Sequence, residues 1–486
     1  MSAVKPKKQE SPKPTTELQQ SSPKKVLTQA ITLVGIVAAY FIITSLPTPS
    51  GLPPEGLKAI AFMVCVMLTW VTQIFPLHVS SVLFLFLIPL LGLNTEAEVA
   101  TRFAGPTIFF MFASFLLAIA LETSGLANRL ALNMSAMSKG NPKILILLIM
   151  TATALVSCVI SNVPCCAAFL PIVLTLCKKN NCLRGKSNFA KAAIIGVIYA
   201  SMFANGTPAG TPINIAGLSL LEEYTGLTIS FGGFSLFGML ITLISIPVLW
   251  LILMLVFPPE FKKLVGMEDY KKELAELGPM SKQEIKYLVV TVLMLVMWFT
   301  DKYHGFSTTA TTVFFGAIYF LPGINLLKFD DIKGKIEWDI IVMTGATIAF
   351  GATMASTGAA KWLADISLMP FASASPILIM LLVSVVSMMS HLLIPSCPAA
   401  VAVMVPVLAE FSKQSGINAM LLFLPLIYTI SNSWLLPFAD PLPMMCWPEK
   451  YFSTKDFFKS GILAHAANTV IVVVIVLLIG KPLNYF

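Results

Sequence analysis

Long apolar runs recur along this chain, and they constrain its fold more than any other feature. Runs such as Val82–Ile88 and Val470–Ile479 contain no charged residue. A membrane-spanning helix needs about 20 apolar residues, whereas the strands of a membrane barrel alternate polar and apolar residues in segments of about ten. Unbroken runs therefore exclude a β-barrel and predict an all-α polytopic membrane protein.

The composition agrees with this class and excludes several others. Hydrophobic residues make up 57% of the chain and charged residues 12%, and the mean hydropathy is +0.84. That apolar mass is enough for at most about thirteen spans. The net charge of +8 is explained by the excess of Lys and Arg in cytoplasmic loops, so nucleic acid is not expected as a partner. The Lys- and Pro-rich segment 1–25 is predicted to be a disordered cytoplasmic tail.

Two apolar runs, 144–177 and 374–410, are too long for one crossing and contain Pro and Ser near their centres. Basic residues lie on both flanks of the first run. If both flanks are cytoplasmic, that run enters and leaves on the same face, as a re-entrant hairpin does. Glu122 and Arg129, at the end of the preceding span, are expected to form an interfacial ion pair.

An internal repeat is visible at a spacing of about 230 residues. Gly125 matches Gly358 within similar Ser/Thr-Gly-Leu/Ala-Ala contexts. The Ser161/Pro171 and Ser396/Pro406 pairs have the same internal spacing, and Thr211-Pro matches Asp440-Pro. Counting the spans between the two copies places the second hairpin on the opposite face. An inverted repeat with paired helix interruptions is typical of secondary transporters.

Two polar motifs interrupt the apolar segments of the first copy. Ser157, Ser161 and Asn162 surround the expected hairpin tip, and their oxygens suit a hard cation such as Na⁺, although Ser and Asn also satisfy a broken helix end. The segment 205–214 reads Asn-Gly-Thr-Pro-Ala-Gly-Thr-Pro-Ile-Asn and cannot be a regular helix. The helix that resumes near residue 215 offers N–H groups to an anion, although a simple hinge is the alternative.

At these residues the chain resembles the divalent anion–sodium symporter family. Members carry a Ser-Asn-Thr tip in each hairpin and a Gly-Thr-Pro-Pro-Asn-like run in the following broken helix. Here the first tip reads Ser161-Asn162-Val163 and the run reads Gly-Thr-Pro-Ile-Asn. The resemblance extends from about residue 26 to the end and implies about eleven spans, scaffold and transport domains, a homodimer, and elevator-type transport of di- or tricarboxylates.

The resemblance also implies site residues. In the family, a first cation lies between the first tip and the broken helix, and the substrate carboxylates meet the hairpin tips and the Thr-Pro steps. The corresponding cation ligands are Ser157, Ser161, Asn162 and Gly206, and the substrate-binding residues of the first half are Ser161, Asn162, Thr211 and Pro212.

The second half departs from the family pattern. Its tip reads Ser396-Cys397-Pro398, and Asp440 replaces the second Thr. These four residues complete the expected substrate site, while the second cation site has lost side-chain oxygens. An acid within a membrane segment is a functional hypothesis by default: Asp440 is expected to bind a cation or carry a proton. The alternative is that it caps the next helix or pairs with Ser431 or Asn432.

The predicted architecture is about eleven transmembrane helices with two re-entrant hairpins in an inverted repeat. Two repeat transport units, 104–218 and 338–445, lie between scaffold helices. The remaining predicted units are the tail 1–25, the scaffold segments 26–103, 219–257, 287–337 and 446–486, and an amphipathic cytoplasmic linker at 258–286.

These expectations favour a secondary active transporter of the succinate, malate, fumarate or citrate class. It is predicted to be multi-pass in the cell (inner) membrane, to have a cytoplasmic N-terminus and to contact lipid. It needs no cofactor beyond Na⁺ as the coupling ion. A Na⁺-independent exchanger or a proton-coupled carrier using Asp440 is the runner-up. A channel would need a continuous polar file, and no catalytic constellation indicates an enzyme.

Overall fold

All regular elements in the part of the chain that the structure describes are helices. This computed structural model describes residues 23–486 except 73, 266, 394–396 and 438–439. Within that part, seven helical segments are long and apolar enough to cross a membrane, and shorter apolar helices accompany them. The seven are Leu27–Ser45, Glu96–Ser124, Asn162–Lys179, Asn188–Gly206, Phe231–Val256, Trp338–Ser356 and Thr454–Gly480. The expected class, an all-α integral membrane protein, is confirmed.

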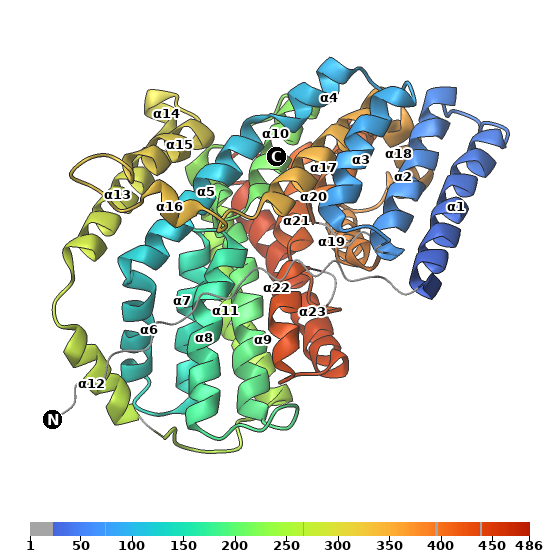
Figure 1. Cartoon of the computed structure of the whole chain (residues 1–486). Helices are drawn as coiled ribbons and strands as arrows, with labels where there is room; N and C mark the ends of the chain where they lie inside the picture. Colours follow the sequence, from blue (N-terminus) through green and yellow to red (C-terminus); the bar gives the residue numbers. More distant parts are fainter. Residues whose placement is uncertain (1–22, 73, 266, 394–396, 438–439) are drawn as a thin grey trace.

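The N-terminal helices lie at one edge of the molecule (Figure 1). Helix α1 (Pro23–Ser45) packs on α2 (Pro54–Thr72), and α3 (Leu77–Leu90) packs on α17 (Trp338–Ser356). Many large apolar side chains of α1 are exposed, which suits contact with lipid chains. Most of the predicted tail, residues 1–22, lies outside the described residues.

Two segments of the chain contain matching helices. Helix α5 (Pro106–Ser124) and α17 each have 19 residues. Each is followed by a left-handed glycine, Gly125 at φ 82° and Gly358 at φ 77°, a conformation that side chains with a Cβ disfavour. Helix α6 (Leu126–Met137) then begins after Gly125, and α18 (Ala359–Ser367) begins after Gly358.

Both segments continue with a helix pair, a buried helix and a shorter helix. In the first segment these are α7 (Pro142–Ser157), α8 (Asn162–Lys179), α9 (Asn188–Met202) and α10 (Pro212–Thr225). In the second they are α19 (Pro376–Leu393), α20 (Cys397–Ser415), α21 (Ala419–Ile430) and α22 (Pro441–Cys446). Pro171 and Pro406 lie at matching places inside α8 and α20. This order agrees with the internal repeat seen in the sequence.

The remaining helices connect and flank the two segments. They are α4 (Glu96–Phe103), α11 (Phe231–Val256), α12 (Met267–Leu277), α13 (Lys282–Phe299), α14 (Asp301–His304), α15 (Thr308–Ile318), α16 (Phe329–Ile332) and α23 (Thr454–Gly480), with short 3₁₀ turns η3 (Met369–Phe371) and η4 (Trp447–Glu449). The predicted linker at 258–286 therefore contains one helix of its own, α12.

The expected Glu122–Arg129 ion pair is wrong. Arg129 instead binds Glu284 at the start of α13, through Nε–Oε1 at 2.6 Å and Nη2–Oε2 at 3.1 Å. Glu122 pairs with Lys335, whose Nζ lies 2.9 Å from Oε2. A spacing of seven residues would place both side chains on one face of a continuous helix, but the left-handed Gly125 separates α5, which carries Glu122, from α6, which carries Arg129. The Arg129 guanidinium holds the pKa of the Glu284 carboxyl at about 2.

Buried helices at the centre of the molecule position the interrupted segments. Helices α7, α8 and α9 lie side by side (Figure 1), and 94% of the apolar stretch that includes α9 is buried. The Tyr199 and Trp434 rings pack at 5.0 Å between centroids, and the Tyr428 hydroxyl donates to the Phe234 carbonyl at 2.7 Å. These contacts join the two repeat segments and α11 into one core.

Candidate functional site

The tip between α7 and α8 holds one residue in an unusual backbone conformation. Ser161 has φ 62° and ψ 152°, a region that is populated almost only by glycine and that costs about 1–3 kcal/mol. Its hydroxyl donates to Asn162 Oδ1 at 3.3 Å, and the Val163 N–H donates to the same oxygen at 3.0 Å. The Asn162 side chain therefore organises the tip while its amide nitrogen remains a donor.

The second interruption begins where α9 ends. Two 3₁₀ turns, η1 (Phe203–Gly206) and η2 (Pro208–Gly210), precede α10, because proline cannot donate a helix hydrogen bond and displaces the chain. Thr211 caps α10 by accepting the Ile213 N–H at 3.4 Å. Thr207 donates to the carbonyl of Cys158, so the broken helix and the hairpin tip are directly joined.

Glycines allow backbone carbonyls to pack closely at the junction between the broken helix and the hairpin tip, where Thr207 contacts Cys158. A Cβ on Gly210 would lie 1.9 Å from the Ala204 carbonyl oxygen and 3.0 Å from that of Ser157. A Cβ on Gly238 of α11 would lie 2.7 Å from the Gly206 carbonyl oxygen. Oxygen-rich, irregular backbone at a helix break is the environment that Na⁺-like cations prefer.

Of the predicted cation ligands, Ser157 and Gly206 lie in this junction, and Ser161 and Asn162 lie at the adjoining tip. The Ser157 hydroxyl donates to the Ala154 carbonyl at 3.0 Å. Buried Asn205 adds an oxygen that sequence reasoning did not select. Its amide nitrogen donates to the Ile427 carbonyl at 3.2 Å, and its Oδ1 has no hydrogen-bond partner among the described residues.

Asp440 occupies the position in the second segment that Thr211 occupies in the first. Their backbone angles agree closely, at φ −149°, ψ 149° for Asp440 and φ −151°, ψ 142° for Thr211. Asp440 caps α22 by accepting the Leu442 N–H at 3.0 Å, and the Cys397 thiol donates to its other oxygen at 3.5 Å. The capping alternative is therefore confirmed, and no bond joins Asp440 to Ser431 or Asn432 among the described contacts.

A small cavity lies between the two caps. Its volume is about 60 Å³, and it brings together six of the eight predicted substrate-binding residues. These are Asn162, Thr211, Pro212, Cys397, Pro398 and Asp440. Ser161 is adjacent to Asn162 but is not part of the lining, and Ser396 lies outside the described residues.

Helix α17 supplies a lining residue that sequence reasoning missed. Thr344 is fully buried in the cavity wall, and its hydroxyl has no hydrogen-bond partner within the described chain. Thr347 and Thr353 on the same helix donate to carbonyls four residues back, at 2.7 and 2.9 Å. Because this local bond is the common state of a helical Thr, the sequence carried no signal that Thr344 differs.

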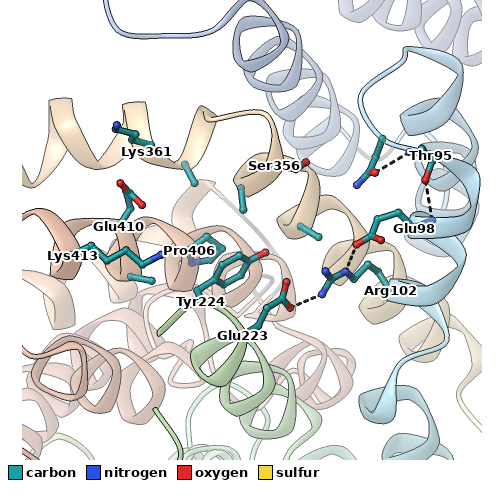
Figure 2. A pocket seen from close by; sticks show the side chains of 15 residues that line it. Thr95, Glu98, Arg102, Glu223, Tyr224, Ser356, Lys361, Pro406, Glu410 and Lys413 are labelled. Carbon is teal, nitrogen blue, oxygen red and sulfur yellow. Dashed lines mark hydrogen bonds and ion pairs between the residues drawn. The ribbon is translucent and has the colours of Figure 1, made fainter. Parts of the chain in front are cut away.

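A larger cleft of about 420 Å³ is lined by α4 and α10 on one side and by α18 and α20 on the other (Figure 2). On one side of this cleft, Arg102 of α4 links α4 to α10, with Nε 2.7 Å from Glu98 and Nη1 2.5 Å from Glu223 of α10. The guanidinium is thus already satisfied by two carboxylates. Figure 2 shows two lysines and an acid at the other side of the cleft, Lys361, Lys413 and Glu410. None of these six lines the smaller cavity.

Known proteins match nearly the whole chain. The sodium-dependent dicarboxylate transporter SdcS of Staphylococcus saprophyticus is 25% identical over 478 residues, which cover 93% of this chain and 92% of that protein. The SdcS transporter of Staphylococcus aureus is 26% identical over 482 residues, covering 94% and 92%.

Two solved structures share the fold. The YdaH transporter of Alcanivorax borkumensis matches with a TM-score of 0.53 at 14% identity, covering 95% of this chain and 99% of that one. MtrF of Neisseria gonorrhoeae matches with a TM-score of 0.54 at 11% identity, covering 94% and 95%. The sequence model of the sodium:sulfate symporter transmembrane region matches residues 27–486. The chain therefore belongs to this family, the divalent anion–sodium symporters that its hairpin and Gly-Thr-Pro motifs resemble.

Proposed function

We propose that the protein is a secondary active transporter of di- or tricarboxylates, of the succinate, malate, fumarate or citrate class, across the cell membrane. One observation carries the proposal: the cavity is built from equivalent positions of two repeated segments. Asn162 and Thr211 come from the first segment, and Cys397 and Asp440 come from the second. A site at the interface of two repeats is accessible from both sides in turn when the repeats rock or move together.

The cavity suits a carboxylate without a fixed cation. Its described lining has no Arg or Lys. It offers hydroxyl donors from Thr211 and Thr344, the Asn162 amide, and the N-terminal end of α10, whose unpaired N–H groups attract anions. Helices α8, α10 and α20 begin at or near the cavity, so the positive ends of three helix dipoles lie beside it.

The coupling ion in this proposal is Na⁺, bound at the junction of the first tip and the broken helix. Ser157, Ser161, Asn162 and Gly206 are the proposed ligands, and the relatives named as sodium-dependent support this choice. Because Asn162 belongs to both the tip and the cavity wall, a cation that orders the tip also completes the anion site. That shared residue gives a physical route for coupling.

The proposal extends to the architecture. About eleven helices cross the membrane, and the α7–α8 and α19–α20 pairs are re-entrant hairpins that enter from opposite faces. The N-terminus is cytoplasmic, the scaffold and transport units follow the division predicted from sequence, and a homodimer supports an elevator motion. Lipid contacts the outer helices, where α1 exposes its apolar side chains.

Asp440 favours a second candidate function. The Asp440 carboxylate in the substrate cavity repels a dianion. By binding a cation or a proton itself, it can replace the second cation site. A Na⁺-independent exchanger, or a carrier that couples the anion to a proton through Asp440, would use the same cavity.

Uptake of labelled succinate, malate and citrate into proteoliposomes separates these candidates. A Na⁺ gradient is expected to drive uptake, and the Asn162→Ala variant is expected to abolish it. Asn133→Ala is the matched control, because Asn133 is an exposed residue of α6 and should transport normally. Uptake that requires preloaded dicarboxylate but no Na⁺ would overturn sodium coupling, and normal transport by Asn162→Ala would overturn the site.

A further inference from the structure

The described lining of the cavity combines several hydrogen-bond donors with one strong acceptor. The Asn162 amide, the Thr211 hydroxyl and the Thr344 hydroxyl are donors, and Thr344 has no other partner within the described chain. Asp440 is the carboxylate among the described lining residues, and an ionised carboxylate only accepts hydrogen bonds. A ligand that satisfies both kinds of group must therefore present acceptors to Asn162, Thr211 and Thr344 and a donor to Asp440.

Asp440 retains capacity to accept further bonds. Its Oδ1 accepts the Leu442 N–H and its Oδ2 accepts the Cys397 thiol, whereas a carboxylate has about four lone-pair sites. The residue is 8% exposed, and no cationic side chain pairs with it among the described ion pairs. A buried acceptor of this kind is stabilised when a ligand donates to it and is costly when left facing another anion.

No Lys or Arg lies beside Asp440 in the described lining of the cavity. Helix α22 also packs on α9, where Lys191 is bound to Asp456 and Tyr199 is bound to Ser460. The side chains that face or adjoin Asp440 are Asn162 at the start of α8, Thr344 of α17, Cys397 of α20, and Ser433, whose hydroxyl lies 3.7 Å from the Cys397 sulfur. A second carboxylate placed here meets no compensating cation among the described residues that line the cavity.

We propose that Asp440 makes the cavity select substrates that donate an O–H hydrogen bond to it, while a carboxylate of the same substrate is held by Asn162, Thr211 and Thr344. This inference rests on the proposed dicarboxylate transport and specifies its substrate. Two sources supply the donor: the hydroxyl of a 2-hydroxydicarboxylate, or the O–H of a dicarboxylate that carries one proton. A fully ionised dicarboxylate without a hydroxyl is disfavoured.

The test compares malate with succinate, which differ by one hydroxyl, in proteoliposome competition assays. At about pH 8, where both ligands are dianions, wild-type protein should prefer malate by about tenfold or more, the effect expected of a hydrogen bond to a charged group. At about pH 5.5, a fraction of the succinate carries a proton, and the preference should narrow. The arm at the higher pH isolates the hydroxyl as the donor, because neither substrate carries a proton there.

Asp440→Asn and Asp440→Thr are the informative variants. Asn and Thr both cap helices well, and Thr restores the residue found at position 211. Both variants should bind succinate more tightly than wild type and lose most of the malate preference at about pH 8. Asp330→Asn, a change at an exposed acid of α16, should preserve the wild-type pattern.

Equal affinity of wild-type protein for malate and succinate at the higher pH would overturn this inference while leaving dicarboxylate transport intact. Retention of the malate preference by both Asp440 variants would also overturn it. A wild-type protein that takes up none of the dicarboxylates would overturn the proposed function itself, and the inference with it.

Discussion

Gly210 provides the sharpest test of how the broken helix supports the cavity. A methyl group at this position would lie 1.9 Å from the Ala204 carbonyl oxygen and 3.0 Å from that of Ser157. Both are backbone atoms, so no side-chain rotation relieves the clash, and the chain must open by about 1 Å at a packed junction. Overpacking of this kind costs about 1–3 kcal/mol, equivalent to about 5- to 150-fold in binding.

Because Gly210 precedes Thr211, the displacement reaches the cavity directly. We expect Gly210→Ala to reduce dicarboxylate uptake by at least about tenfold, measured in proteoliposomes with matched protein content. The control is Gly232→Ala on α11, whose added methyl would lie 3.8 Å from Phe299 in ordinary contact and should transport normally. If Gly210→Ala transports with the same rate and KM as the wild-type protein, the close packing of backbone carbonyls around Gly210 does not position Thr211, the cap of α10, and the reasoning is refuted.

Two further predictions concern single polar groups. Thr344→Val keeps the shape of the side chain and removes a hydroxyl without a partner in the described chain; it should weaken dicarboxylate binding about five- to tenfold without lowering the melting temperature. Unchanged affinity by calorimetry would show that this hydroxyl does not touch the ligand. Glu284→Gln should lower the Tm near neutral pH, and the difference from wild type should shrink as the pH falls from 4.5 toward 2, because the folded-state pKa is about 2. A pH-independent difference would contradict the role of the ion pair with Arg129.

Much of the helical order could be predicted because it depends on local signals. Apolar runs indicated the membrane helices, and Gly125 with Gly358 marked equivalent helix ends, since only glycine readily adopts their left-handed conformation. The pairing of Thr211 with Asp440 also came from sequence, through the proline that follows each residue and fixes the start of a helix.

The residues that could not be predicted depend on tertiary packing. Thr344 lies in an apolar helix whose other threonines bond locally, and only its position opposite the two caps distinguishes it. Arg129 was assigned to a nearby acid, but Glu284, far away in the sequence, is its partner. Closeness in the sequence does not predict the partner of an ion pair when a glycine between the two charged residues changes the direction of the backbone.

The matched caps have a consequence for chirality. Thr211 and Asp440 share one backbone conformation but carry different side chains, so the two matching segments contribute unlike groups to the cavity. A ligand with unlike ends fits it in one orientation only. The two mirror-image forms of a hydroxy acid would then direct their hydroxyl groups to different walls of the cavity. The protein should therefore distinguish D-malate from L-malate, although two matching segments build its site.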